Sequence, residues 1–183
     1  MSTSCIRFSI GPSALGPLLL AATERGICAV RLGASAELLE RGLLEERAPI
    51  ALDRDDAGLA AWIAELQRAC EGRPPLRELP LDLPSGPFRR RVWEALRAIP
   101  LGQTRTYAEL ARALGRPRAA RAVGQACAAN PVALLLPCHR VVPAGGGPGG
   151  YRWGSERKQV LLRAESRHAR ASQDPCPAGV AAR

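Results

Sequence analysis

A proline-rich segment from residue 73 to residue 87 divides the chain into two parts with different properties. It holds five prolines, which interrupt helices and interior strands, so we expect a linker there. The net charge changes at the same place. Residues 1–85 carry nine Arg and 12 acidic residues, a net of −3, whereas residues 86–165 carry 14 basic and four acidic residues, a net of +10. The sequence therefore predicts an N-terminal structural domain over 1–85, ending in the linker, and a basic domain over 86–165. Residues 166–183 are expected to form a disordered tail.

Short apolar runs alternate with turn residues in the N-terminal part, which is typical of an antiparallel sheet. The runs lie at residues 5–10, 18–23 and 27–32, separated by Gly11-Pro12 and Glu24-Arg25-Gly26. Two helices are predicted after these strands, at residues 35–46 and 56–71. The second helix places Trp62 and Cys70 on one apolar face and ends at Gly72.

The basic part is predicted to be mainly helical and to contain a helix-turn-helix. After a helix over residues 88–99, Thr106 and Glu109 fit a capping box, in which each side chain binds the other's backbone amide at a helix start. A glycine turn follows, and a second helix is predicted over residues 118–128, with Pro117 suited to its first turn. Together with the N-terminal sheet and its helices, this arrangement predicts an α+β fold.

Small side chains dominate the second helix of this motif, and only Arg118, Arg121 and Gln125 project from it. Small residues let a backbone approach another surface closely, and the wall of a DNA groove is one such surface. An isolated Arg121 could fill the hole that an extruded base leaves in the stack. The same residues also fit an ordinary alanine-rich helix packed in a core, with solvated arginines. On these residues alone, both interpretations stay open.

A cysteine stands beside a histidine in the segment Pro137-Cys138-His139-Arg140-Val141-Val142. The segment follows an apolar run over residues 132–136, where we expect a buried strand to end. A thiol is a strong nucleophile only as thiolate, which neighbouring positive charge or a base stabilises. His139 and Arg140 supply both. A free cysteine can also be a plain core residue, but the flanking proline, histidine and arginine favour an activated thiol.

The six cysteines lack the spacing of a secreted disulfide framework, so we expect reduced thiols and a cytoplasmic protein. The apolar stretch 14–22 is interrupted by Gly16 and Pro17 and is too short to span a bilayer. We therefore expect no targeting segment and no membrane span. Cys5 and Cys28 lie near the N-terminus with neither histidine nearby, and two ligands do not make a structural zinc site, so no metal is predicted.

Residues 88–165 resemble the catalytic domain of the O6-alkylguanine-DNA alkyltransferases, the methylated-DNA–protein-cysteine methyltransferases. Residues 18–32 resemble the N-terminal part of the same family more loosely. The GYRWG motif is most similar to bacterial members, and the resemblance covers nearly all of the chain except the tail. The matching motifs keep the family's order and spacing: FRRRVW at 88–93, IPLG at 99–102, TY at 106–107, RAARAVG at 118–124, ANP at 129–131, PCHRVV at 137–142 and GYRWG at 150–154.

The resemblance implies a role for each residue around the thiol. Cys138 would be the nucleophile and the alkyl acceptor. His139 would be its base and would act through a water molecule, because neighbours on a strand point to opposite faces. Glu165, on the last helix, would orient the imidazole. Asn130 would hold the turn between the DNA-recognition helix and the active-site strand.

The same resemblance implies how DNA is bound. Arg121 would replace the flipped base in the stack, and Tyr107 would press on the phosphate that rotates during flipping. Tyr151 would help to wall the guanine pocket. Backbone groups of Cys138, Val141 and Arg152 would read the guanine edge. Arg118, Gln125 and Arg140 complete the set of DNA- or substrate-binding candidates.

The implied function is DNA repair by direct reversal of damage. A methyl or other alkyl group would pass irreversibly from guanine O6 in double-stranded DNA to Cys138, once per molecule and without cofactor or metal. O4-methylthymine is a second candidate substrate, and the protein is expected to be a monomer with no obligate protein partner. The four-cysteine phosphotriester-repair domain of bifunctional relatives is missing, so we do not expect a transcription activator.

Two other functions fit parts of the sequence. The first is a helix-turn-helix module that binds lesions or regulates genes without catalysis; relatives that only sense lesions lack the acceptor cysteine, which this chain has. The second is a cysteine hydrolase of small acyl substrates, which would leave the basic half and the Arg121 helix without a purpose.

Overall fold

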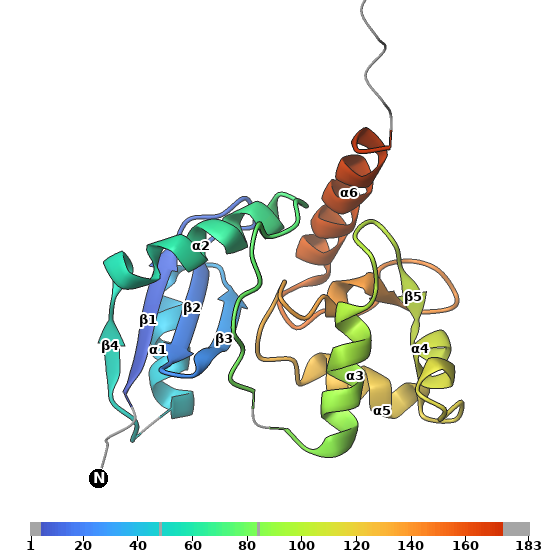
Figure 1. Cartoon of the computed structure of the whole chain (residues 1–183), viewed down its shortest axis with the longest axis horizontal. Coiled ribbons are helices and arrows are strands. Elements are labelled where there is room, and N and C mark those ends of the chain that lie inside the picture. Colours follow the sequence, from blue (N-terminus) through green and yellow to red (C-terminus); the bar gives the residue numbers. More distant parts are fainter. Residues whose placement is uncertain (1–4, 48, 84, 174–183) are drawn as a thin grey trace, which may run out of the picture.

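The computed structural model describes residues 5–47, 49–83 and 85–173 (Figure 1). A four-stranded sheet with two helices forms the N-terminal part, and a mainly helical part with a helix-turn-helix follows the linker. The predicted α+β class is confirmed.

The sheet consists of β1 (Ile6–Gly11), β2 (Leu18–Thr23), β3 (Gly26–Leu32) and β4 (Leu52–Arg54), in the order β3-β2-β1-β4. The first three strands pair antiparallel with their sequence neighbours, as predicted. β4 pairs parallel with β1 at the edge of the sheet and was not predicted. Its three residues, Leu-Asp-Arg, offer one apolar side chain, which gives no strand pattern.

One helix covers each face of this sheet. α1 (Ala36–Arg47) buries Leu39 and Leu43 against one face, and α2 (Asp56–Cys70) buries residues such as Leu66 against the other. Successive residues of β2 point alternately to the two helices, Leu19 toward α1 and Leu20 toward α2. Burial on both sides explains why β2 is a continuous apolar run.

The α2 side of the sheet shares its core with the C-terminal part of the chain. That core continues into α3 (Pro87–Arg97) through Val92, Trp93 and Leu96. The outer edge of β3 is covered by backbone from both the linker and the C-terminal part. The Ile27 amide donates to the Pro80 carbonyl at 2.8 Å, and the Val30 amide donates to the Pro131 carbonyl at 2.9 Å. Apolar packing and backbone pairing therefore join the two parts.

The prediction of a buried strand before Cys138 is wrong. Val132 makes a single bridge to Val30, and the chain then turns, with Leu134 at a φ of 71°. Cys138 begins a short 3-10 helix, η1 (Cys138–Arg140), before β6 (Val141–Val142). Four residues of the apolar run 132–136 are buried and Leu135 is half-buried, and burial alone does not require a strand.

The helix-turn-helix has its two helices at α4 (Tyr107–Ala113) and α5 (Ala120–Ala128). The predicted capping box is present at the start of α4. The Glu109 amide donates to Thr106 Oγ1 at 3.1 Å, and the Thr106 amide donates to Glu109 Oε2 at 2.6 Å. α5 begins two residues later than predicted, so Pro117 and Arg118 lie in the turn. Before α4, β5 (Arg105–Thr106) pairs parallel with β6 and ties this motif to the Cys138 segment.

The final helix, α6 (Ser155–Ala171), runs past the predicted end of the folded region. Residues 166–171 are helical, which corrects the expectation of a tail disordered from 166 onward. The helix continues because these residues pack on the preceding part of the chain. Ala169 lies so close to Gly102 that a Cβ added there would be 2.7 Å from the Ala169 Cβ. Residues 174–183, with Cys176, lie outside the described residues. No helix in the described ranges is both long and apolar enough to cross a membrane.

Candidate active site

Asn130 holds the turn that places Cys138. Its Nδ2 donates to the Leu136 carbonyl at 2.8 Å and to the Cys138 sulfur at 3.2 Å, and its Oδ1 accepts from the Val132 amide at 2.9 Å. Both Asn130 and Cys138 are buried. One amide side chain therefore closes the turn and contacts the thiol, in agreement with the position predicted for Asn130.

His139 and Arg140 both point to Glu165 of α6. His139 Nε2 lies 2.8 Å from Glu165 Oε1, and both residues are almost completely buried. Arg140 donates to the two carboxylate oxygens at 2.9 and 3.0 Å, and its Nη1 donates to the Ile99 carbonyl at 2.6 Å. Arg140 was predicted to bind DNA or substrate. In the structure it is half-buried, and three of its N–H donors bind Glu165 and Ile99.

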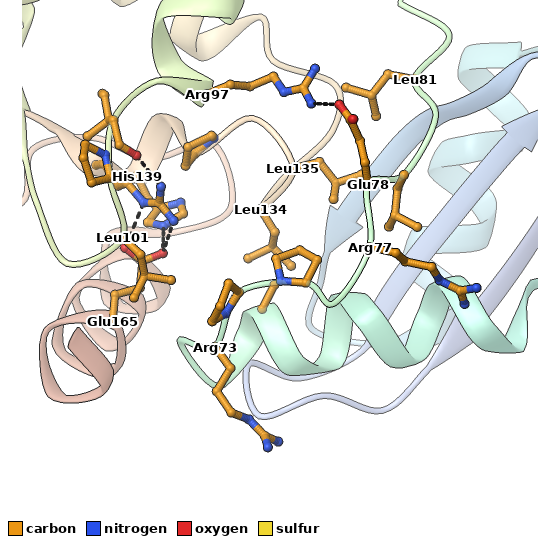
Figure 2. A pocket seen from close by; sticks show the side chains of 18 residues that line it. Arg73, Arg77, Glu78, Leu81, Arg97, Leu101, Leu134, Leu135, His139 and Glu165 are labelled. Atoms are coloured by element: carbon orange, nitrogen blue, oxygen red, sulfur yellow. Dashed lines mark hydrogen bonds and ion pairs between the residues drawn. The ribbon is translucent and has the colours of Figure 1, made fainter. Parts of the chain in front are cut away.

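This pair contacts a cavity of about 340 Å³ on the linker side of the molecule (Figure 2). His139 and Glu165 form one wall of the cavity, and apolar residues such as Leu134 and Leu135 form another. Glu78 of the linker forms an ion pair with Arg97 of α3 at its edge. The linker therefore covers the rear of the His139–Glu165 pair.

The surroundings of Glu165 and His139 decide their charges. Burial raises the pKa of Glu165, but hydrogen bonds from His139 and Arg140 outweigh it, together with the charge of Arg140 and, in acid, of protonated His139. They lower this pKa to about 2. Burial lowers the pKa of His139, which the Glu165 carboxylate only partly opposes. At neutral pH the carboxylate is ionised and the imidazole is neutral, so its free nitrogen can accept a proton.

Burial also governs Cys138. It raises the pKa of this thiol, although the Asn130 hydrogen bond and the charge of Lys158 act in the opposite direction. Among the described residues, no hydrogen bond joins Cys138 to His139, and His139 Nδ1 is buried without a protein partner. The raised pKa keeps the thiol neutral at rest, and this agrees with the missing hydrogen bond to His139.

Lys158 is a residue that the sequence analysis missed. It is completely buried, and its Nζ donates to the carbonyls of Val141 at 2.6 Å and Gly150 at 3.3 Å. It thereby joins the two ends of a Gly/Pro-rich loop over residues 143–150. Two signals could have revealed it: it is the single lysine among 25 arginines, and it lies seven residues before Glu165, on the same helix face.

Aromatic rings continue the wall beyond His139. The Tyr151 ring lies 6.3 Å from the His139 ring, edge to face, and 5.0 Å from the ring of Trp153. Tyr151 is half-buried, whereas Arg152 is exposed. Val141 is buried, and its backbone carbonyl accepts a hydrogen bond from Lys158.

The helix-turn-helix combines the two interpretations that its sequence left open. The inner face of α5 is ordinary core, with Val123, Ala126 and Cys127 buried, and Trp93 Nε1 donates to the Ala126 carbonyl at 3.0 Å. On the outer side, the exposed residues predicted to bind DNA are Arg118, Arg121 and Gln125. Tyr107 is half-buried and lies close to this helix. A Cβ added at Gly124 would be 3.8 Å from the Tyr107 ring.

Comparisons with known proteins match both halves of the chain. Residues 6–83 match the 6-O-methylguanine DNA methyltransferase ribonuclease-like domain, and residues 87–167 match the DNA-binding domain of the same name. The crystal structure of the Mycobacterium tuberculosis O6-methylguanine methyltransferase superposes with a TM-score of 0.74 at 34% identity, covering 88% of this chain and 93% of that one. The chain belongs to the 6-O-methylguanine DNA methyltransferase family.

Curated members of the family are similar over part of their length. The Escherichia coli bifunctional transcriptional activator/DNA repair enzyme Ada is 43% identical over 164 residues, which cover 88% of this chain and 46% of Ada. A methylated-DNA–protein-cysteine methyltransferase of Mycolicibacterium paratuberculosis is 53% identical over 95 residues, 52% of this chain and 58% of that protein. The chain spans about half the length of the curated relatives it matches.

Proposed function

We propose that this protein repairs O6-alkylguanine in double-stranded DNA by transferring the alkyl group irreversibly to Cys138. The observation that carries the proposal is the buried Cys138 thiol, held by Asn130 next to a His139–Glu165 pair, in a chain of the 6-O-methylguanine DNA methyltransferase family. Methyl transfer to cysteine is also what the names of its relatives state.

The reaction requires the neutral thiol to lose its proton as the substrate enters. His139, neutral and hydrogen-bonded to ionised Glu165, takes this proton through a bridging water, and Glu165 stabilises the imidazolium that forms. The sulfur attacks the alkyl carbon, the bond from that carbon to O6 breaks, and its electron pair stays on the guanine, which then gains a proton. The product thioether has no easy leaving group, so each molecule acts once.

Flipping the damaged base out of the duplex would bring its O6 to the buried sulfur. Extrusion costs a few kcal/mol, and least for a base that is already poorly paired. Arg121, exposed on α5, fills the vacated place in the stack, and Arg118 and Gln125 contact the DNA beside it. Tyr107, half-buried beside Gly124 of α5, presses on the phosphate that rotates.

The remaining parts of the proposal concern scope. O4-methylthymine in DNA is a second candidate substrate, and the reaction requires no cofactor, metal or protein partner. The protein acts as a monomer in the cytoplasm, where thiols stay reduced. The free thiols of Cys5, Cys28, Cys70, Cys127 and Cys138 in the described part of the chain support this location.

A duplex with a single O6-methylguanine tests the reaction. After incubation and digestion, mass spectrometry should find one added methyl group on the peptide that contains Cys138. Cys138→Ala should gain none, whereas Cys127→Ala, which removes a neighbouring buried thiol, should still gain one. Methylation of Cys127 in the wild type would contradict the assignment. Tight binding of the damaged duplex without any methyl gain would favour a lesion-binding module without catalysis.

A further inference from the structure

Arg157, in the first turn of α6, joins the two halves of the molecule. It is half-buried, and its guanidinium donates to three backbone carbonyls: Leu15 at 2.8 Å, Gly33 at 2.7 Å and Trp153 at 2.9 Å. Leu15 precedes β2 and Gly33 follows β3, so both belong to the N-terminal half. These two loops are themselves joined, because the Gly33 amide donates to the Pro17 carbonyl at 3.1 Å.

The third acceptor, Trp153, leads directly to the reacting groups. The Trp153 ring packs edge to face on Tyr151, and Tyr151 packs in the same way on His139. These three rings, from Trp153 to His139, are called the aromatic wall below. Arg157 binds the outer end of the wall at its backbone, and His139 forms the inner end.

The segment that carries the wall depends on such anchors. It follows a loop in which Gly146, Gly147 and Gly149 have positive φ, and Gly154 after it has a φ of 102°. Glycine backbones have the largest conformational freedom, so this segment has little intrinsic preference for one path. Lys158 fixes its beginning at Gly150, and Arg157 fixes its end at Trp153.

We propose that Arg157 is a positioning residue for alkyl transfer: it fastens the aromatic wall to the N-terminal sheet, so that the N-terminal half sets the geometry of the reaction. This inference rests on the proposed function. A planar guanidinium can bind three carbonyls at once because it presents five donors in a fixed fork, which a lysine ammonium cannot reproduce.

The N-terminal side of the same contact can be changed without touching α6. Gly16 has a φ of 95°, and a Cβ there would lie 3.1 Å from the Gly33 carbonyl oxygen and 3.5 Å from Arg157 Nη2. Gly16→Ala should therefore push the guanidinium and its acceptor apart. If Arg157 transmits the position of the N-terminal half, this distant change should reproduce the effect of removing the guanidinium.

Single-turnover kinetics and hydrogen exchange on the full chain test the proposal. Arg157→Met should lower the rate of methyl transfer at saturating O6-methylguanine duplex about 10- to 100-fold, the loss typical of a misplaced reacting group. Affinity for an undamaged duplex should stay within about twofold, because the helix-turn-helix is untouched. Amide exchange should accelerate in residues 150–154 and stay unchanged in α4 and α5. Arg157→Lys should resemble Arg157→Met, and Arg163→Ala, at an exposed arginine of the same helix, should resemble the wild type.

Gly16→Ala should also slow transfer, and combined with Arg157→Met it should add little, since both act on one contact. Gly16→Ala alone still tests the proposal if Arg157→Met does not fold. Transfer by Arg157→Met or Gly16→Ala within twofold of the wild type would overturn the proposal, as would exchange accelerated throughout the chain. If the wild type methylates no cysteine, the proposed function fails, while exchange at residues 150–154 still shows whether Arg157 holds the wall.

Discussion

In the proposed reaction the nucleophile is Cys138, whose resting form is the neutral thiol. Apolar surroundings favour that form, and the Asn130 amide is the polar group in direct contact with the sulfur. Thiolate therefore forms only when a base removes the proton, and in the proposed mechanism His139 does so with the help of Glu165. A thiol kept neutral until substrate arrives is also poorly reactive toward oxidants, which act on thiolate.

Asn130→Ala should impair both stability and transfer. The substitution removes the donor to the sulfur and leaves the buried Val132 amide unpaired, at about 1–3 kcal/mol. The Leu136 carbonyl loses one of its two donors and keeps the Cys138 amide. We expect a lower urea midpoint together with a transfer rate that falls at least about tenfold. A variant with normal transfer and reduced stability would show that Asn130 holds only the turn.

Glu165 should make stability depend on pH in a defined window. Its pKa is about 2 in the folded protein and about 4.3 in an unfolded chain, so the ionised form is stabilised by roughly 3 kcal/mol above that range. Because the folded pKa is the lower one, this contribution is present above pH 4.3 and is lost as the pH falls to 2. Urea unfolding of wild type and Glu165→Gln should differ most at neutral pH and converge in this window. Glu156→Gln, at an exposed position of the same helix, is the control; a difference that does not change with pH would contradict the assigned pKa.

At the scale of the element, the two faces of α5 differ. Its buried residues pack against α3, and Arg121, which we propose to enter a DNA duplex, is exposed on the opposite side. Arg121→Ala should lower the transfer rate from duplex DNA at least about tenfold, because the vacated stack loses its substitute. Reaction with free O6-benzylguanine, which needs no flipping, should change little. Arg41→Ala, at an exposed position of α1, controls for net charge, and equal losses on both substrates would remove the stack-filling role.

Element prediction from the sequence succeeded where a local pattern decides the structure. The antiparallel strands and the capping box of α4 are set by alternation, turn residues and one side-chain pair, all readable along the chain. The segment 132–136 could not be predicted, because its turn is fixed by backbone bonds to β3 and by Asn130. The extension of α6 beyond residue 165 likewise depends on packing against Gly102.

In the candidate site, too, local sequence motifs predicted some residues, whereas tertiary contacts decided the others. The Cys138, His139 and Asn130 positions followed from sequence motifs, and the structure brings them together. Arg140 and Lys158 could not be placed, since the direction of a side chain on a 3-10 helix or a buried helix face is decided by tertiary contacts. Both bind groups within the protein: Arg140 binds the Glu165 carboxylate, and Lys158 binds two backbone carbonyls.

At the scale of the whole molecule, the charge change at the linker does not separate two cores. Val30 of β3 is completely buried and pairs through its backbone with residues 131 and 133 of the C-terminal part. Val30→Ala should therefore cost about 2 kcal/mol and lower the urea midpoint of the entire chain. Far-UV circular dichroism and tryptophan fluorescence should give coincident transitions. Two separated transitions, with only the first shifted, would mean that the halves unfold independently.

The number of alkyl groups removed per protein molecule tests the central claim most directly. A fixed amount of protein is incubated with increasing O6-methylguanine duplex, and repaired guanine and methylated Cys138 are both counted. Repair should reach a plateau at one methyl group per molecule, equal to the methylated Cys138, and should not resume with time. Repair that continues beyond one group per molecule would contradict the claim that Cys138 is an acceptor used once.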